Sequence, residues 1–293
     1  MKQICMQAGG IDAAPRTTEG SLYPNIDDTY SVVFYEGERL VVRKQQFFGI
    51  KSLGNMDSSK QGLAIYGNKV VRMANVSTST THLIYQISSA GVLSQLATFT
   101  ASTGHSNSLQ FAPTLESGQT FPYLYVANLL KKCSVLSISS SYEVSIVQTI
   151  TIGISEVAND CNVQIGDDGY IWAVELDSNN HYHFMKFRRV AVSEGDVTLT
   201  ASDIVDEWAT VESYPYATYV WQGMKIRAGK IWFVYGQTGP SKARGIVVYD
   251  TATHAYVTTL NLASVNYEFE DMDFWNDSVI IATYSSPYYQ IQL

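Results

Sequence analysis

Cysteine, charge and long apolar runs are all scarce in this sequence, and each scarcity argues against a class of protein. The 293 residues include three cysteines, too few and too scattered for a disulfide framework, and no CxxC pair that would hold zinc through thiolates. No stretch approaches the roughly 18 apolar residues of a membrane-spanning helix, so no membrane contact is expected. The first residues lack the apolar run of a secretion signal, and we therefore expect a protein that is cytoplasmic at synthesis.

Charge is low in amount and acidic in balance. Only 16% of the residues are charged, the formal net charge is −8 and the isoelectric point is near 5.1. Nucleic acid is not an expected partner, because neutralising phosphates requires a basic surface. The chain instead holds 46% hydrophobic residues, with 20 tyrosines and 5 tryptophans, and this composition suits β-strands.

Five short segments repeat one pattern: a polar or small pair, an apolar residue, any residue, and a second apolar residue. Each is followed, after a turn, by another run that resembles a β-strand. The copies begin 46–61 residues apart, and a period of about 40–60 residues with several strands per unit is typical of a β-propeller. The five segments are residues 61–65, 107–111, 161–165, 222–226 and 270–274.

We therefore predict an all-β fold, a single five-bladed propeller over residues 27–293, preceded by an arm or linker over residues 1–26. The fifth blade has too little chain to complete a sheet, and an open ring would expose strand edges. A strand at 30–35 or 39–43 is expected to complete it. The predicted blades are 58–101, 105–152, 159–204, 219–262, and 268–293 together with 30–50.

The innermost strand of each blade lines the propeller axis, so the repeat should gather distant residues at one rim of the central channel. Convergent polar groups in such a place are the expected ligand-binding site. Polar residues there also satisfy free backbone groups and bind channel water, and both interpretations stay open. The candidate ligand-binding residues of this axis ring are Gln61, His105, Asn107, Asn159, Gln222, Glu270 and Asp271.

Two members of the ring have side chains suited to acid–base catalysis. His105 would act as a general base near Glu270. No familiar catalytic motif occurs, which leaves open whether the protein is an enzyme. No metal site or cofactor is predicted, because the acidic residues around Glu270 offer oxygen ligands for Ca²⁺ but match no EF-hand spacing.

Aromatic residues ahead of the fourth repeat offer a second kind of site. Tyr216, Tyr219 and Trp221 are candidates for stacking on sugar rings or for a protein interface, and packing between blades is the alternative.

The pattern resembles the five-bladed propellers of phage tail receptor-binding proteins and of helveticin-type bacteriocins. Residues 61–68, residues 222–226 and the pair His105 and Asn107 carry the resemblance, which covers roughly residues 58–293. It implies a surface-attachment module that binds cell-wall or capsular glycan, either on a virion or on a protein released by lysis.

Three functions are therefore expected, in order of preference. The first is a non-enzymatic recognition module for cell-surface carbohydrate. The second is a glycan lyase or hydrolase with its site at the axis, and the third is a scaffold for protein partners. The partner is a glycan or a protein, and the sequence does not indicate the oligomeric state.

Overall fold

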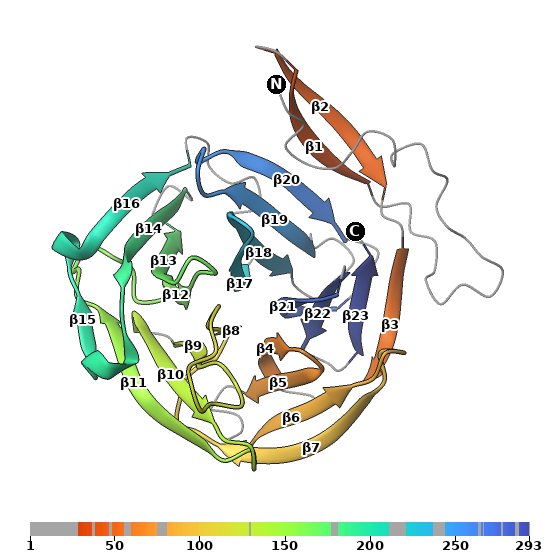
Figure 1. Cartoon of the computed structure of the whole chain (residues 1–293). Coiled ribbons are helices and arrows are strands. Elements are labelled where there is room, and N and C mark those ends of the chain that lie inside the picture. Colours follow the sequence, from red (N-terminus) through yellow and green to blue (C-terminus); the bar gives the residue numbers. More distant parts are fainter. Residues whose placement is uncertain are drawn as a thin grey trace.

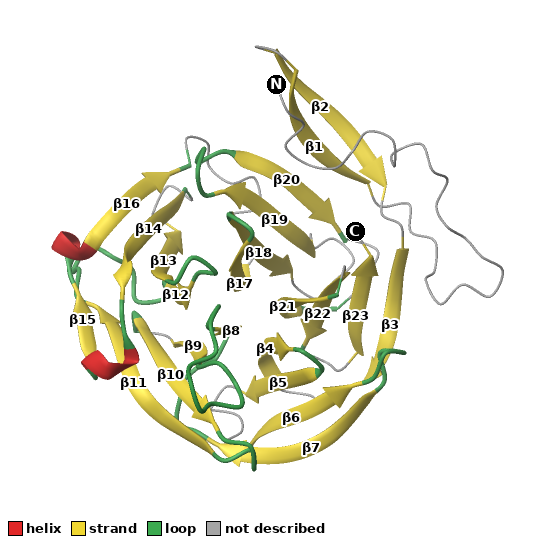
Figure 2. Ribbon diagram, viewed as in Figure 1, coloured by secondary structure: helices red, strands yellow, loops and turns green. Residues whose placement is uncertain are grey.

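The computed structural model is an all-β molecule of five small sheets arranged in a ring (Figure 1). Strands dominate its regular structure (Figure 2), and the described part of the chain adds two short 3-10 helices, η2 (Val192–Glu194) and η3 (Ala201–Asp203). The predicted five-bladed propeller is confirmed. The structure describes residues 29–36, 39–46, 49–55, 60–74, 81–128, 130–176, 181–210, 221–236, 244–262, 265, 267–276, 278–284 and 287–292.

Each repeated segment lies in the innermost strand of a blade or begins one residue before it, and the following strands are added outwards. The first blade comprises β4 (Lys60–Tyr66), β5 (Lys69–Ala74), β6 (Thr81–Ile87) and β7 (Leu93–Thr100). The second comprises β8 (Ser108–Phe111), β9 (Leu124–Asn128), β10 (Lys132–Ile138) and β11 (Val144–Ile152), with the parallel strand β15 (Val197–Leu199) at its outer edge.

The remaining three blades follow the same order. The third comprises β12 (Asn162–Ile165), β13 (Tyr170–Leu176), β14 (Tyr182–Arg189) and β16 (Ile204–Ala209). The fourth comprises β17 (Trp221–Arg227), β18 (Lys230–Gly236), β19 (Arg244–Asp250) and β20 (Tyr256–Asn261). The fifth contains β21 (Phe269–Trp275), β22 (Ser278–Thr283) and β23 (Pro287–Gln292).

The hydrophobic core is divided among the five gaps between neighbouring blades. One cluster, for example, joins Val71 and Ile84 of the first blade to Val126 and Leu136 of the second. Four further clusters join the second blade to the third, the third to the fourth, the fourth to the fifth, and the fifth to the first. Each blade thus buries both of its faces, which requires a neighbour on each side and therefore a closed ring.

A strand from the N-terminal part of the chain completes the fifth blade, as expected, but it is not either of the strands that we named. β3 (Gly49–Asn55) pairs with β23, with Ile50 opposite Ile291 and Lys51 opposite Gln290. The expectation that 30–35 or 39–43 would fill this place was wrong. β3 directly precedes the first blade, and consecutive elements usually lie side by side, so the nearest strand takes the open edge.

The two earlier strands extend a different blade. β1 (Thr29–Glu36) and β2 (Arg39–Gln46) form a hairpin, and β1 pairs with β20 of the fourth blade at Ser31–Thr259 and Val32–Thr258. In Figure 1 the hairpin projects outwards from the ring beside β20.

The third blade also extends past residue 204, its expected end. β16 continues to Ala209 and forms the outermost strand. Its anchor is Trp208, whose ring stacks on Phe184 with 3.8 Å between ring centroids.

Candidate functional site at the propeller axis

The second and fourth positions of each repeat share one face of the innermost strand, because a β-strand turns alternate side chains to opposite faces. These residues are Gly62 and Ala64, Ser108 and Gln110, Asn162 and Gln164, Gly223 and Lys225, and Asp271 and Asp273. Ala64 lies in the core between the first and second blades. The polar side chains of the set form hydrogen bonds to other innermost strands.

Hydrogen bonds from β8 to β17 cross the axis. The Ser108 hydroxyl donates to the Met224 carbonyl at 2.6 Å. The Gln110 side-chain amide donates to the Ile226 carbonyl at 2.9 Å and accepts from the Ile226 N–H at 3.1 Å. These side chains supply the partners that inner strands of different blades cannot supply through a shared ladder.

A buried ion pair fills the centre. The Lys225 ammonium lies 2.8 Å from both carboxylate oxygens of Asp271 and also donates to the Leu109 carbonyl. Asp271 accepts the backbone N–H groups of Leu63 at 2.8 Å and Leu109 at 3.1 Å. Burial raises the pKa of Asp271 to about 6, while Lys225 and the Leu63 N–H oppose this rise. The ion pair therefore ties β4, β8, β17 and β21 together.

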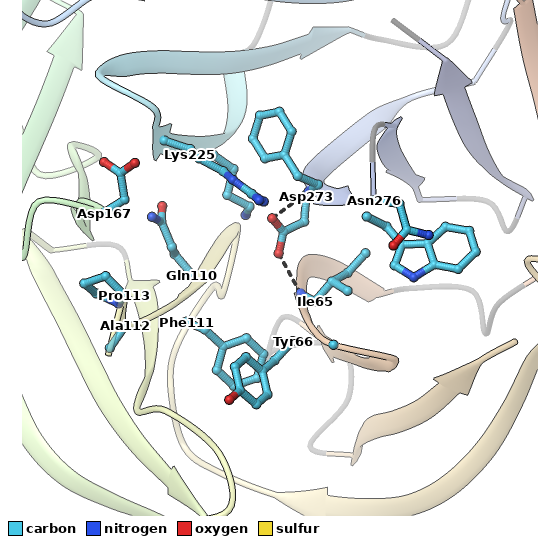
Figure 3. A pocket seen from close by; sticks show the side chains of 14 residues that line it. Ile65, Tyr66, Gln110, Phe111, Ala112, Pro113, Asp167, Lys225, Asp273 and Asn276 are labelled. Carbon is cyan, nitrogen blue, oxygen red and sulfur yellow. Dashed lines mark hydrogen bonds between the residues drawn. The ribbon is translucent and has the colours of Figure 1, made fainter. Parts of the chain in front are cut away.

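A pocket of about 570 Å³ opens beside this ion pair (Figure 3), where the innermost strands end and turn into the second strands. Its aromatic lining is Tyr66, Phe111, Phe274 and Trp275. Its polar lining is Gln110, Asp167, Lys225, Arg227, Asp273 and Asn276. All five innermost strands or their turns contribute, so the pocket lies on the axis.

The carboxylate of Asp273 is fixed in the pocket wall. It accepts the Ile65 N–H at 2.6 Å, drawn as a dashed line in Figure 3, and the Phe274 N–H at 2.7 Å. Burial raises its pKa, and Lys225 and the two N–H donors oppose the rise. A carboxylate held in this way presents a defined hydrogen-bonding edge to a ligand.

The rim of the pocket combines exposed aromatic and charged groups. Tyr66 is 37% exposed and packs against Phe111, with 5.7 Å between ring centroids. The Arg227 guanidinium lies 4.8 Å above the Phe274 ring, a cation–π contact. Asp167 is exposed and accepts the Ala228 N–H at 2.5 Å. The rim therefore offers apolar faces and charges of both signs within one opening.

Most residues of the expected axis ring lie near the opposite ends of the same strands, where the strands begin. Gln61, Gln222 and Glu270 are buried there, and Asn107 is partly buried. Asp271 lies deeper, in the central ion pair.

Two members of the expected ring differ from the buried ones. His105 is half-buried, and burial lowers its pKa. Asn159 is exposed, and its carbonyl accepts the Leu130 N–H at 2.6 Å.

The aromatic candidates before the fourth repeat are not tested by the structure. Tyr216 and Tyr219 lie outside the described residues. Trp221 begins β17, but its side chain is also outside the described part.

Sequence reasoning missed the pocket because it treated the fourth repeat position as unconstrained. That position holds Gln110, Lys225 and Asp273, three of the polar lining residues. The fourth position lies between two apolar positions and yet holds charged residues. That contrast could have indicated a polar environment on this face of the strands.

The described residues contain neither a metal-binding cluster nor a membrane-spanning helix. No three His, Cys, Asp or Glu side chains in this part of the chain are grouped so that they could hold a metal ion. None of its helices has the length and apolar character needed to span a lipid bilayer.

Comparison with known proteins identifies the fold. No family model matches the sequence, and no curated protein matches it in sequence. Among solved structures the chain is similar to the tail fibre of Staphylococcus aureus phage P68, with 11% identity and a TM-score of 0.53. The match covers 83% of this chain and 53% of the fibre, so the chain spans about half of that protein's length. A likeness at this identity shows the fold alone.

Two enzymes are more distant structural neighbours. Virginiamycin B lyase from Staphylococcus aureus matches with 13% identity and a TM-score of 0.42, over 83% of this chain and 99% of the lyase. The periplasmic gluconolactonase of Pseudomonas aeruginosa matches with 11% identity and a TM-score of 0.46, over 87% of this chain and 89% of that enzyme. Neither likeness carries an inference about the chemistry of this chain.

Proposed function

We propose that this propeller is a recognition module that binds carbohydrate on a cell surface, and that the axis pocket is its binding site. The observation that carries the proposal is the composition of the pocket, in which Tyr66 and Phe274 offer aromatic faces beside the fixed carboxylate of Asp273 and the exposed guanidinium of Arg227. A sugar ring has apolar C–H faces and a hydroxyl edge, and this pocket offers partners for both.

The size of the pocket supports the same conclusion. Small-molecule sites commonly enclose about 300–1,000 Å³, and this one encloses about 570 Å³. We infer that it takes one or two sugar units, with the rest of a longer glycan extending past the rim.

The biological setting that we propose is attachment to a bacterial surface, as part of a phage or prophage particle. The fold likeness to a phage tail fibre supports this setting. The acidic, weakly charged composition also suits a glycan partner better than a nucleic acid.

The enzymatic alternative depends on His105 and Glu270. Within the described part of the chain, neither the Nδ1 atom of His105 nor the Oε2 atom of Glu270 has a hydrogen-bond partner, so the two groups are not joined through these atoms. We therefore place recognition ahead of catalysis.

A glycan array combined with a product assay tests the proposal. The full chain is expected to bind a subset of bacterial surface glycans and to release no new reducing or unsaturated ends from them over hours. Release of such products would contradict a purely recognition role and would indicate an enzyme instead. Absence of binding to every glycan would reject the proposal and favour a protein partner.

A further inference from the structure

The connection between β8 and β9 is much longer than the corresponding connections of the other four blades. It comprises residues 112–123, twelve in all, whereas two residues join β4 to β5, β17 to β18 and β21 to β22, and four join β12 to β13. Loops between paired antiparallel strands usually have about two to five residues, and long loops commonly carry function. This loop, drawn in green beside β8 in Figure 2, is therefore not required by the propeller fold alone.

The β8–β9 loop is closed at its base and anchored in the core. The Ala112 N–H donates to the Tyr123 carbonyl at 2.8 Å, which joins the two ends of the loop. Phe121 is 4% exposed and belongs to the core cluster between the first and second blades. The segment between these anchors, residues 113–118, is exposed. A compact surface loop whose ends are close and whose own side chain packs beneath it is an Ω-loop, a type that is frequently functional.

Phe121 also connects the loop to a tyrosine on either side. The centroid of its ring lies 6.2 Å from that of Tyr66, at the rim of the pocket, and 6.1 Å from that of Tyr142, in the turn between β10 and β11. Tyr142 is partly exposed. Because β10 is antiparallel to β9, with Leu136 opposite Leu124, this turn lies at the same end of the second blade as the loop. One ring therefore separates the pocket tyrosine from Tyr142.

The loop begins in the wall of the pocket and leads away from it. Ala112 and Pro113 line the pocket, as Figure 3 shows. Beyond Pro113 the loop presents Leu115, which is 46% exposed, and the exposed hydroxyl-bearing residue Ser117. An apolar side chain near a hydroxyl offers partners both for the C–H faces and for the hydroxyls of a sugar. The loop thus extends the pocket wall with chemistry of the same kind.

We propose that the β8–β9 loop and Tyr142 form a second subsite, which binds the sugar units of a longer glycan that follow those held in the axis pocket. The inference rests on the proposed function, because its ligand is the continuation of the same glycan. The pocket takes one or two sugar units, so the next units must leave it past its wall. Among the five connections between innermost and second strands, this loop alone is long enough to extend that wall.

Titration with oligosaccharides of increasing length tests the proposal. The fragments are cut from a glycan that the array selects, and the shortest has the one or two units that fill the pocket. The wild type is expected to bind the longer fragments at least about fivefold more tightly than the shortest one. Equal affinity for fragments of every length would overturn the second subsite.

Two substitutions locate the subsite, each with a matched control. Tyr142→Ala and Leu115→Ala should each weaken binding of the longer fragments by about fivefold and leave binding of the shortest unchanged. Tyr267 also packs on one ring, that of Tyr289, with 6.1 Å between centroids, and Leu96 is 38% exposed on the outer strand β7. Tyr267→Ala and Leu96→Ala should therefore bind every fragment as the wild type does.

Two results would overturn the subsite: unchanged binding of the longer fragments in Tyr142→Ala and Leu115→Ala, or equal losses for short and long fragments, which would show that the loop only supports the pocket. If Tyr142→Ala fails to fold, the exposed Leu115 still provides the comparison.

The shortest fragment judges the proposed function separately. If its binding depends on Tyr66 and Arg227, recognition at the pocket stands whatever the longer fragments show. If no fragment binds, the proposed function fails and the second subsite fails with it.

Discussion

At the scale of single residues, the central feature is the ion pair between Lys225 and Asp271 at the propeller axis. Both are fully buried, and each also bonds the backbone of another blade. A buried ion pair adds little net stability compared with an apolar pair, but removing one partner leaves an uncompensated charge. The pair therefore specifies how four innermost strands meet.

Lys225→Met is expected to destabilise the protein by roughly 3–5 kcal/mol, because it leaves the Asp271 carboxylate buried without its counter-charge. Urea unfolding measures the change. Lys132→Met, at an exposed position of β10, is the matched control and should stay within about 0.5 kcal/mol of the wild type. The double variant Lys225→Met, Asp271→Asn should recover part of the loss. A single variant as stable as its control would contradict this role.

His183 links two strands of the third blade in a pH-dependent way. Its Nδ1 atom lies 2.9 Å from Glu175 and its Nε2 atom 2.7 Å from Glu207 of β16. Burial lowers the pKa of His183, but the hydrogen bonds to Glu175 and Glu207 outweigh burial, and the net change is a raised pKa.

The sign of the effect on stability follows from that raised pKa. The stabilisation is fully present below the pKa of the unfolded chain, about 6.5, and is lost as the pH rises through the higher folded-state pKa. As the pH rises across this range, the wild type should therefore lose its extra stability relative to His183→Gln. Unfolding both proteins in urea at several pH values measures the difference in stability. A difference that grows as the pH rises would contradict the prediction.

At the scale of elements, ring closure depends on a single strand. β3 covers the edge of β23, and Leu53 of β3 packs against the cluster that joins the first and fifth blades. Without β3, β23 would present unpaired backbone groups to other chains. The β1–β2 hairpin, in contrast, extends a sheet that already has four strands.

Two truncations separate these roles. A chain that starts at residue 48 keeps β3 and should melt close to the wild-type temperature. A chain that starts at residue 58 loses β3 and should melt lower, by about 2–4 °C for each kcal/mol lost, and should aggregate. Thermal unfolding with light scattering records both effects. Equal melting temperatures for the two truncations would show that β3 does not close the ring.

At the scale of the whole molecule, the sequence predicted the five-bladed fold but not the position of the pocket. The apolar third and fifth repeat positions, such as Leu63 and Ile65, must enter the core and therefore revealed five blades. The strand that closes the ring was not distinguishable, because β1, β2 and β3 all resemble strands. The pocket could not be predicted for another reason. Gln110, Lys225 and Asp273 occupy a position that the apolar pattern leaves free, although all three side chains are buried, and they come together only in the closed ring.

Two pairs of matched variants probe the pocket within the intact molecule. Tyr66 and Tyr256 are similarly exposed, at 37% and 39%, but only Tyr66 lines the pocket. Arg227 and Arg189 each lie 4.8 Å above an aromatic ring, but only Arg227 lines the pocket. Within each pair, alanine removes the same kind of side chain once from the pocket and once from a position outside it.

The most direct test is calorimetric titration of a glycan selected by the array into the wild type and these four alanine variants. The account predicts that Tyr66→Ala and Arg227→Ala each weaken binding by about tenfold, which is about 1.4 kcal/mol, while Tyr256→Ala and Arg189→Ala bind as the wild type does. Unchanged binding in Tyr66→Ala and Arg227→Ala, or equal losses in all four variants, would contradict recognition at the axis pocket.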